Sequence, residues 1–389
     1  MYLSKEVFSQ PTKQFSEAIQ ERKKRGEEII SLGLGEPDLS TPQYVIDAMA
    51  KAISDGYTKY CPAQGLPELR KKISEFYNKN NKIEIDEENV IVMPGIKAAL
   101  SFSLATILKP FDEVIYCTPC YVSYPAQIKI AEPTASLIPL DFKKSDFSFD
   151  IEKFRSLVTP KTKCLIIANP NNPTGNILTR EEIEQISKIC IDNGIYIISD
   201  EVYDQIIFGD KEFVSFGDYP EVEHNLITIN GYSKSHAMTG WRLGYAIAPK
   251  ILINQMIRLN FNINTNVTTF IQKAACSIYE HDFSHLEEYR GKLKKRMEFF
   301  HGNIKKDGYF ESVLPKAGFF YFLNIKNSGL TSNEFASLLV KKTGIACTPG
   351  IAFGDNWDDY VRFSLAVPFE TVEQASRIIS DFSKQIMEN

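Results

Sequence analysis

The sequence lacks the features that mark membrane, secreted or nucleic-acid-binding proteins. No run approaches the roughly 20 apolar residues that a membrane helix needs. The start, Met1 to Glu6, has no basic segment followed by an apolar run, so no secretory signal is visible. The net charge is −5, which argues against nucleic acid or an anionic membrane as a partner. We therefore expect a cytoplasmic protein.

Cysteine and histidine are sparse and irregularly placed. Seven scattered cysteines, an odd number, suit reduced thiols in the cytoplasm. Cys117 and Cys120 form a lone C-x-x-C pair, which disfavours structural zinc and leaves a redox role open. His281 and His285 have helical spacing but no glutamate of a metalloprotease helix between them, so we expect two histidines on a helix surface. The sequence therefore predicts no metal site.

A complete dinucleotide-binding fingerprint is also missing. Gly33-Leu34-Gly35 follows a short predicted strand, but Pro37 comes at once and no further glycine has the required spacing. A nicotinamide oxidoreductase is therefore disfavoured. A tight loop that brings backbone near a ligand is the simpler interpretation.

What the chain does contain is material for a large core, with 43% hydrophobic residues in a length of 389. Apolar runs of strand length alternate with helical segments in its first two thirds, and from about His281 the pattern changes to a long charged helix followed by mixed elements. The predicted strands of the first part are Val90–Met93, Val114–Tyr116, Cys164–Ala168, Ile195–Ile198 and Leu226–Ile229. This alternation predicts an α/β fold with a mostly parallel sheet covered on both faces, plus a smaller α+β domain.

Chemically versatile side chains follow these strands, which is where ligands bind in such sheets. Asn169 to Gly175 follows one strand, Asp200 and Tyr203 the next, and Lys234 with Arg242 the third. A free lysine has a pKa of about 10.4, so burial or a nearby cation must lower it before the amine becomes a nucleophile. Alone, Lys234 is an ordinary surface lysine, but beside the other motifs it becomes a candidate nucleophile.

In this order the motifs resemble those of fold-type I pyridoxal-phosphate enzymes, specifically class I/II aminotransferases, and most closely the bacterial aspartate and aromatic aminotransferase subgroup. The likeness spans essentially the whole chain. It is carried by Gly-Glu-Pro-Asp (35–38), Thr-Lys-Tyr (58–60), Asn-Asn-Pro-Thr-Gly (171–175) and Met-Thr-Gly-Trp-Arg-Leu-Gly-Tyr (238–245). It implies a large cofactor-binding domain (43–284) with a mostly parallel seven-stranded sheet between helices. It further implies an N-terminal arm that joins the small domain (1–42) and a small C-terminal domain (285–389).

The resemblance assigns roles around pyridoxal 5'-phosphate. Lys234 would bond the cofactor aldehyde and then carry protons as general base and acid. Asp200 would keep the pyridine nitrogen protonated, while Tyr203 and Asn172 would bond the ring oxygen. The other expected cofactor contacts are the ring of Tyr121, the backbone of Gly95, Ile96 and Lys97, the side chains of Ser233 and Arg242, and Tyr60 from a second subunit. The last contact implies a homodimer with shared active sites.

Substrate recognition is expected to centre on Arg362, which would clamp the α-carboxylate with Gly35, Tyr121 and Asn172 nearby. A buried structural ion pair is the alternative for Arg362. Lys97 matches a basic position linked to acidic substrates, whereas Gln10 stands where some aspartate-using relatives have lysine. We expect transamination between an L-amino acid and a 2-oxo acid, with aspartate, glutamate or aromatic donors. A lyase or decarboxylase of the same fold and a non-catalytic effector-binding module are the alternatives.

Overall fold

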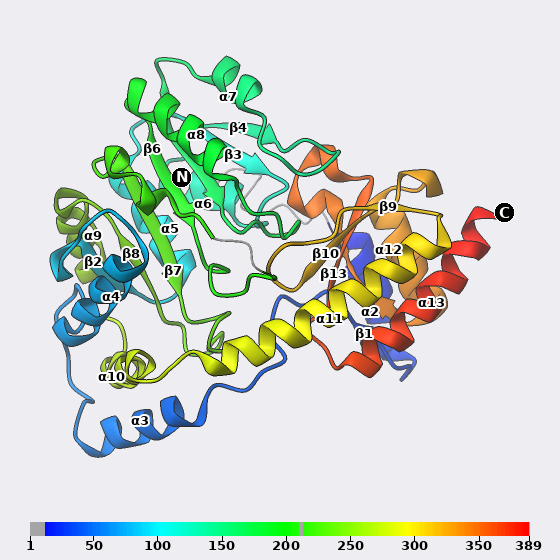
Figure 1. Ribbon diagram of the computed structural model, residues 1–389, viewed down its shortest axis with the longest axis horizontal. Coiled ribbons are helices and arrows are strands. Elements are labelled where there is room, and N and C mark those ends of the chain that lie inside the picture. The colour runs from blue at the N-terminus through cyan, green and yellow to red at the C-terminus, as the bar shows by residue number, and fades with distance from the viewer. Residues whose placement is uncertain (1–11, 210–212, 389) are drawn as a thin grey trace.

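The computed structural model describes residues 12–209 and 213–388. Its largest feature is a seven-stranded sheet in which every strand except β8 runs in the same direction. In sheet order the strands are β2 (Val90–Met93), β8 (Gly244–Ile247), β7 (Leu226–Gly231), β6 (Tyr196–Asp200), β5 (Thr162–Ala168), β3 (Glu113–Thr118) and β4 (Ser136–Asp141). The expected mostly parallel seven-stranded sheet is thus confirmed (Figure 1).

Helices cover both faces of this sheet because the strand residues are apolar on both sides. In β2, Val90 and Val92 join a core with helices on one face, whereas Ile91 and Met93 join a core with helices on the other. All four side chains are fully buried, as expected for the interior of an α/β sheet. The helices of this part are α3 (Gln43–Ser54), α4 (Pro67–Asn80), α5 (Ile96–Ile107), α6 (Tyr124–Ala131), α7 (Ile151–Leu157), α8 (Arg180–Asp192), α9 (Lys250–Ile263) and α10 (Thr269–Ala275).

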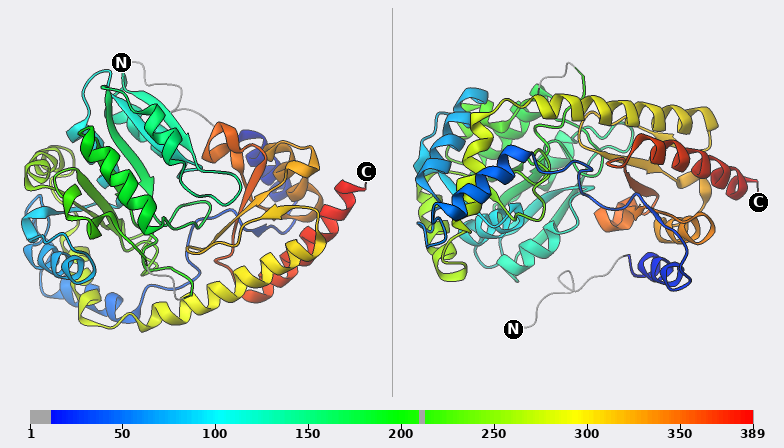
Figure 2. Two further views of the ribbon diagram at one scale, coloured as in Figure 1. Left: turned by 45° about the horizontal axis from the view of Figure 1, so that its top comes forward. Right: turned by 90° about the horizontal axis from the view of Figure 1, so that it is seen from below.

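A second core lies to one side of the sheet, and the long helix α11 runs out to it (Figures 1 and 2). Its centre is a four-stranded sheet in the order β12-β13-β10-β9, packed against helices. The chain's early segment belongs here, because β1 pairs with β11 (Ile30 with Ile345) and α2 packs on α12. The elements are α2 (Lys13–Lys24), β1 (Ile30–Ser31), α11 (Ser284–Asp307), β9 (Glu311–Ser312), β10 (Phe320–Asn324), α12 (Ser332–Thr343), β11 (Ile345–Ala346), β12 (Thr348–Pro349), β13 (Tyr360–Ser364) and α13 (Phe369–Met387).

Two local expectations need correction. His281 and His285 do not share a helix, because His281 has extended backbone and stacks on Tyr44, while His285 lies in the first turn of α11. Cys117 and Cys120 are free but fully buried, and burial raises the pKa of both thiols, which disfavours the reactive thiolate. The redox role left open for this pair therefore has no support.

Two kinds of feature are absent from the described residues, a membrane-spanning helix and a cluster of metal-binding side chains. In those residues no helix is both long and apolar enough to cross a bilayer. The same part of the chain holds no group of three or more histidine, cysteine or acidic side chains arranged to bind a metal ion.

Candidate functional site

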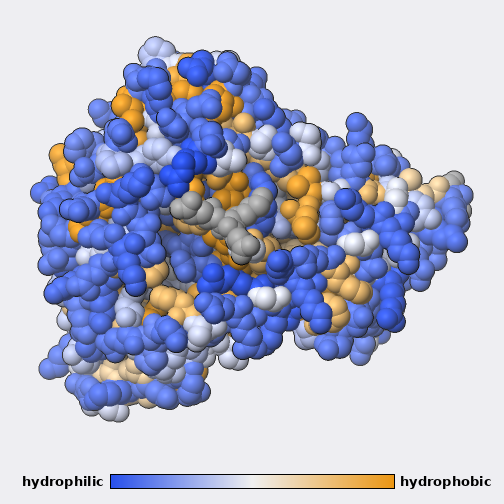
Figure 3. Space-filling model, in the orientation of Figure 1, coloured by the Kyte–Doolittle hydropathy of each residue, from blue (hydrophilic) through white to orange (hydrophobic). Residues whose placement is uncertain are grey.

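The site lies where the carboxyl ends of the parallel strands face the second core, since Arg362 of β13 bonds Asn172. On the face that Figure 3 shows, the surface is hollowed between the two parts of the molecule. Asn172 follows β5, Asp200 ends β6, and Lys234 comes shortly after β7. Main-chain hydrogen bonds hold these strand ends in step, from Asn169 N to Asp200 O and from Glu201 N to Ile229 O. The sequence prediction that these segments meet at one edge is therefore correct.

Lys234 has the environment of a nucleophilic amine. Its Nζ donates to the Gly35 carbonyl at 2.6 Å, which holds the amine in the site. Burial, with the positive charge of Arg362 as the next cause, lowers the pKa of Lys234 to about 8. A substantial fraction of the amine is therefore neutral near physiological pH, as attack on a carbonyl requires.

Asp200 is buried at the end of β6 and is held by a partner that the sequence analysis missed. The Tyr124 hydroxyl donates to Asp200 Oδ2 at 2.7 Å, and the Val202 N–H donates to Oδ1 at 3.3 Å. Burial raises the pKa of Asp200, while the bond from Tyr124 and the charge of Lys234 oppose that shift. The only sequence signal for Tyr124 was its place one helical turn after Tyr121.

Arg362 reaches the site from β13 and is almost fully buried. Its guanidinium donates to Asn172 Oδ1 (3.1 Å) and to the Gly33 carbonyl (2.8 Å), and its Cζ lies 4.0 Å and 4.9 Å from the ring centroids of Phe320 and Phe353. No carboxylate of the described residues forms an ion pair with it, so the alternative of a buried structural ion pair is not what the structure has. Its buried Nε lacks a hydrogen-bond partner there, which leaves a charged donor for a ligand.

The start of α5 forms a cradle that suits a phosphate. Gly95 has a φ of +87°, and a methyl group added to it would lie 2.6 Å from Arg242 Nη2, so the guanidinium sits directly against this turn. The Gly95 N–H donates to the Met93 carbonyl, which leaves the N–H groups of Ile96 and Lys97 as the backbone donors of the first turn. Ser233 is buried next to Lys234.

The remaining expected residues divide into near and distant ones. Tyr203 is buried against Phe319 and Phe320 behind Lys234, and burial raises the pKa of its hydroxyl. Tyr121 packs edge-on against Tyr124, and Lys97 Nζ lies 5.5 Å from its ring centroid. Tyr60, by contrast, is 86% exposed and reaches no partner among the residues that the structure describes. Gln10 lies outside the described residues.

The observed residues fit pyridoxal 5'-phosphate. The group requires an amine for its aldehyde, a carboxylate for its ring nitrogen and a cationic cradle for its phosphate. The structure offers Lys234 with a lowered pKa, the buried Asp200, and Arg242 against the first turn of α5. The buried, unsatisfied Nε of Arg362 supplies the donor that a carboxylate substrate would need.

The chain is similar to known aminotransferases over most of its length. Residues 27–379 match the family model described as aminotransferase class I and II. The chain is 35% identical to the aspartate aminotransferase of Geobacillus stearothermophilus, covering 98% of this chain and 99% of that protein. It is also 35% identical to aromatic-amino-acid aminotransferase 2 of Thermococcus litoralis, covering 90% of each.

A solved aspartate aminotransferase of Thermus thermophilus, a double mutant, superimposes with a TM-score of 0.92 at 29% identity, over 98% of this chain and 99% of that one. The crystal structure of an aromatic aminotransferase from Pyrococcus horikoshii gives 0.89 at 34% identity, over 94% and 99%. The family and fold expected from the motifs are both confirmed. The chain belongs to the class I and II aminotransferases, which have the type I fold, use pyridoxal 5'-phosphate and transfer amino groups between amino acids and oxo acids.

Proposed function

We propose that this aminotransferase uses Lys234, Asp200, Tyr203 and Arg362 to move an amino group from an L-amino acid to a 2-oxo acid. The observation that carries the proposal is that Lys234 and Arg362 converge on one short loop. The amine donates to the Gly35 carbonyl and the guanidinium to the Gly33 carbonyl. A substrate whose carboxylate is held by Arg362 would therefore present its α-carbon near the amine.

Bound pyridoxal phosphate would supply the aldehyde and the electron-accepting ring. Lys234 Nζ would hold the cofactor and, once displaced by the substrate amine, would carry a proton from the substrate α-carbon to the cofactor carbon that bore the aldehyde, with the reverse transfer when the 2-oxo acid accepts the amino group. Asp200 would keep a proton on the pyridine nitrogen, and Tyr124 holds that carboxylate in place. Asn172 and Tyr203 would bind the ring oxygen. Arg362 keeps the substrate carboxylate bound, which favours amino transfer over decarboxylation.

We further propose aspartate or glutamate as the preferred donor, with aromatic amino acids second. The relatives named above are aspartate and aromatic aminotransferases. Lys97 is exposed in the first turn of α5 and lies over the Tyr121 ring, where its charge could meet a second carboxylate. Lys97→Leu should raise KM for aspartate several-fold and leave KM for phenylalanine unchanged; equal effects on both would contradict this assignment.

The same proposal includes a homodimer in which Tyr60 enters the partner's site. It also includes the domain boundaries expected above and a cytoplasmic location. Tyr60, Leu34, Phe261 and Ile263 are large apolar side chains that are each more than 60% exposed, which a second copy would cover. All seven cysteines are unpaired, as in a reducing compartment. Hybrid dimers of Tyr60→Ala and Lys234→Ala subunits should regain part of the activity; none at all would argue against sharing.

The test of the central claim is an absorbance spectrum of the purified protein with pyridoxal phosphate, followed by titration with single amino acids. The wild type should show the band of lysine-bound cofactor, and a donor should convert it to the amine form with release of the matching 2-oxo acid. Lys234→Ala should show neither band nor turnover. A wild-type protein without that band would refute the assignment of Lys234.

A further inference from the structure

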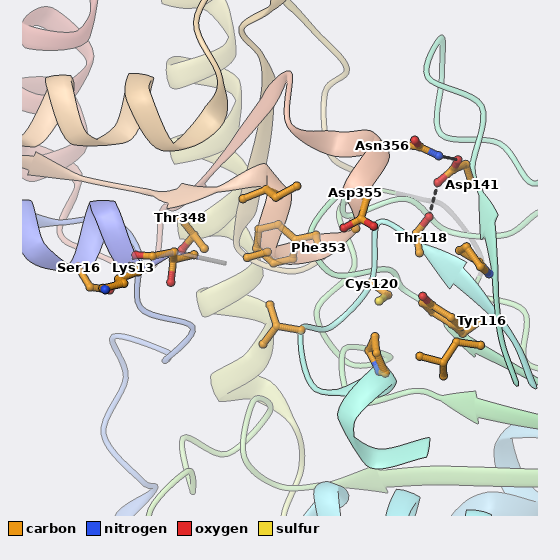
Figure 4. A pocket seen from close by; sticks show the side chains of 18 of the residues that line it. Lys13, Ser16, Tyr116, Thr118, Cys120, Asp141, Thr348, Phe353, Asp355 and Asn356 are labelled. Atoms are coloured by element: carbon orange, nitrogen blue, oxygen red, sulfur yellow. Dashed lines mark hydrogen bonds between the residues drawn. The ribbon is translucent and has the colours of Figure 1, made fainter. Parts of the chain in front are cut away.

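The carboxylate of Asp141 joins the seven-stranded sheet to the loop that follows β12. It lies at the end of the edge strand β4, directly opposite Thr118 of β3. Its Oδ1 accepts from the Thr118 hydroxyl and from Trp357 Nε1 (3.2 Å), and its Oδ2 accepts from Asn356 Nδ2 at 2.6 Å. Figure 4 shows Thr118 and Asn356 converging on this carboxylate from opposite sides. Asp141 therefore bonds partners from both parts of the molecule.

The loop held in this way is closely packed on one side. It consists of two short turns, Gly350–Phe353 and Asp355–Trp357. Trp357 is fully buried among aromatic rings, and a methyl group on Gly354 would lie 3.1 to 3.2 Å from Trp357 and Thr118. The loop is tightly packed only around Trp357, and on its other side residues 351–356 line a cavity of about 1430 Å³. A shift of the packed side is passed along the loop, because packed interiors yield little.

The same loop delivers two contacts to the active site. The ring centroid of Phe353 lies 4.9 Å from Cζ of the Arg362 guanidinium. The Phe353 carbonyl accepts from the Cys120 N–H at 3.0 Å, and Cys120 immediately precedes Tyr121. Both Arg362 and the loop that bears Tyr121 are thus in contact with one residue whose position depends on Asp141.

We propose that Asp141 is a positioning residue for substrate binding, which acts through Trp357, Asn356 and Phe353 to hold the guanidinium of Arg362 in the geometry that a carboxylate requires. The inference rests on the proposed function in one respect, the assignment of Arg362 as the carboxylate clamp. Planar, bidentate recognition is sensitive to orientation, so a displaced Phe353 weakens substrate binding while Lys234 and Asp200 remain in place.

The test compares Asp141→Ala with the conservative Asp141→Asn in the holoenzyme, using the best donor from the spectral titration. Alanine removes every acceptor and should raise KM for the amino acid and for the 2-oxo acid about tenfold, with kcat within threefold of wild type and a normal cofactor band. Asparagine keeps Oδ1 for Thr118 and Trp357, and Asn356 can turn its amide to match the new one. We expect Asp141→Asn to stay within threefold of wild type in both constants.

Asp359→Asn is the matched control, since Asp359 pairs with Lys144, which lies 5.3 Å from the Trp357 ring centroid, but Asp359 bonds none of Thr118, Asn356 and Trp357. It should leave KM unchanged. If Asp141→Ala fails to fold, Asn356→Ala removes one of the three bonds and should raise KM about threefold. A KM within twofold of wild type in the alanine variants, an Asp141→Asn as defective as Asp141→Ala, or an equal effect of Asp359→Asn would each overturn the inference.

Arg362→Leu separates this inference from the function on which it rests. Loss of substrate binding in that variant together with normal Asp141→Ala kinetics refutes only the role of Asp141. An unchanged KM in Arg362→Leu refutes the carboxylate clamp itself.

Discussion

His236 should make the protein acid-labile, and the size of the effect follows from its surroundings. The imidazole is 3% exposed, two residues beyond Lys234, and its Nδ1 pairs with the Ser235 hydroxyl at 2.9 Å. Its Nε2 has no partner among the described residues, and the ring of His285 lies 5.0 Å away. Burial, and to a lesser extent His285, lowers the pKa of His236 to about 3. The neutral ring is therefore the form that the fold accepts.

The sign follows from proton binding. In the unfolded chain this imidazole has a pKa of about 6.5, so between pH 6.5 and 3 the unfolded state binds more protons than the folded state. Stability is therefore lost as pH falls through this window. At pH 5 the loss from this residue comes to about 2 kcal/mol relative to pH 8. His236→Phe keeps a ring of similar size and should remove this dependence.

The assay is denaturant unfolding of wild type and His236→Phe at pH 8 and pH 5, with pyridoxal phosphate and protein concentration held constant. The stability difference between the two proteins should shift by about 2 kcal/mol in favour of the variant at pH 5. His224→Asn, at an exposed histidine, is the control and should follow the wild type. A shift below about 0.5 kcal/mol would show that the buried ring accepts a proton as readily as a free one, which would refute the reasoning.

Three further predictions concern other buried groups. Burial raises the pKa of Glu201 from 4.5 to about 8, so the free energy of unfolding falls as pH rises through that range. The wild type should lose about 3 kcal/mol between pH 4.5 and 7 through this residue. Glu201→Gln should abolish that loss in the same unfolding assay. Tyr124→Phe removes the hydrogen bond to Asp200 and should lower kcat/KM about tenfold in steady-state kinetics, because a bond to a charged group contributes about 1.5–3 kcal/mol. An unchanged kcat/KM would mean that Asp200 does not need this hydrogen bond. Gly95→Ala strains a φ of +87° and crowds Arg242, so the Kd for pyridoxal phosphate should rise about tenfold in a fluorescence titration. An unaltered Kd would contradict the role of this turn in phosphate binding.

Sequence patterns alone determined the chemistry and the main architecture. Strands such as Val90–Met93 could be predicted because a strand buried on both faces is a continuous apolar run. Lys234, Asp200 and Asn172 could be placed together because the carboxyl ends of parallel strands meet at one edge. The strands β4 and β8 were missed. β4 contains Pro139, which only an edge position tolerates, and β8 is short and antiparallel in a parallel sheet.

Only the tertiary structure decided how distant segments complete these residues. Tyr124 bonds Asp200 across 76 positions of sequence, and Trp357 bonds Asp141 across 216. Phe353 and Arg362 are only 9 positions apart but belong to separate elements. No local periodicity encodes such pairs, because side-chain orientation depends on how helices, loops and sheets pack. The lowered pKa of Lys234 belongs to the same class, since burial and the charge of Arg362 arise only when the two parts of the chain come together. The sequence predicts Lys234 as the nucleophile, whereas the lowered pKa of its amine follows only from packing.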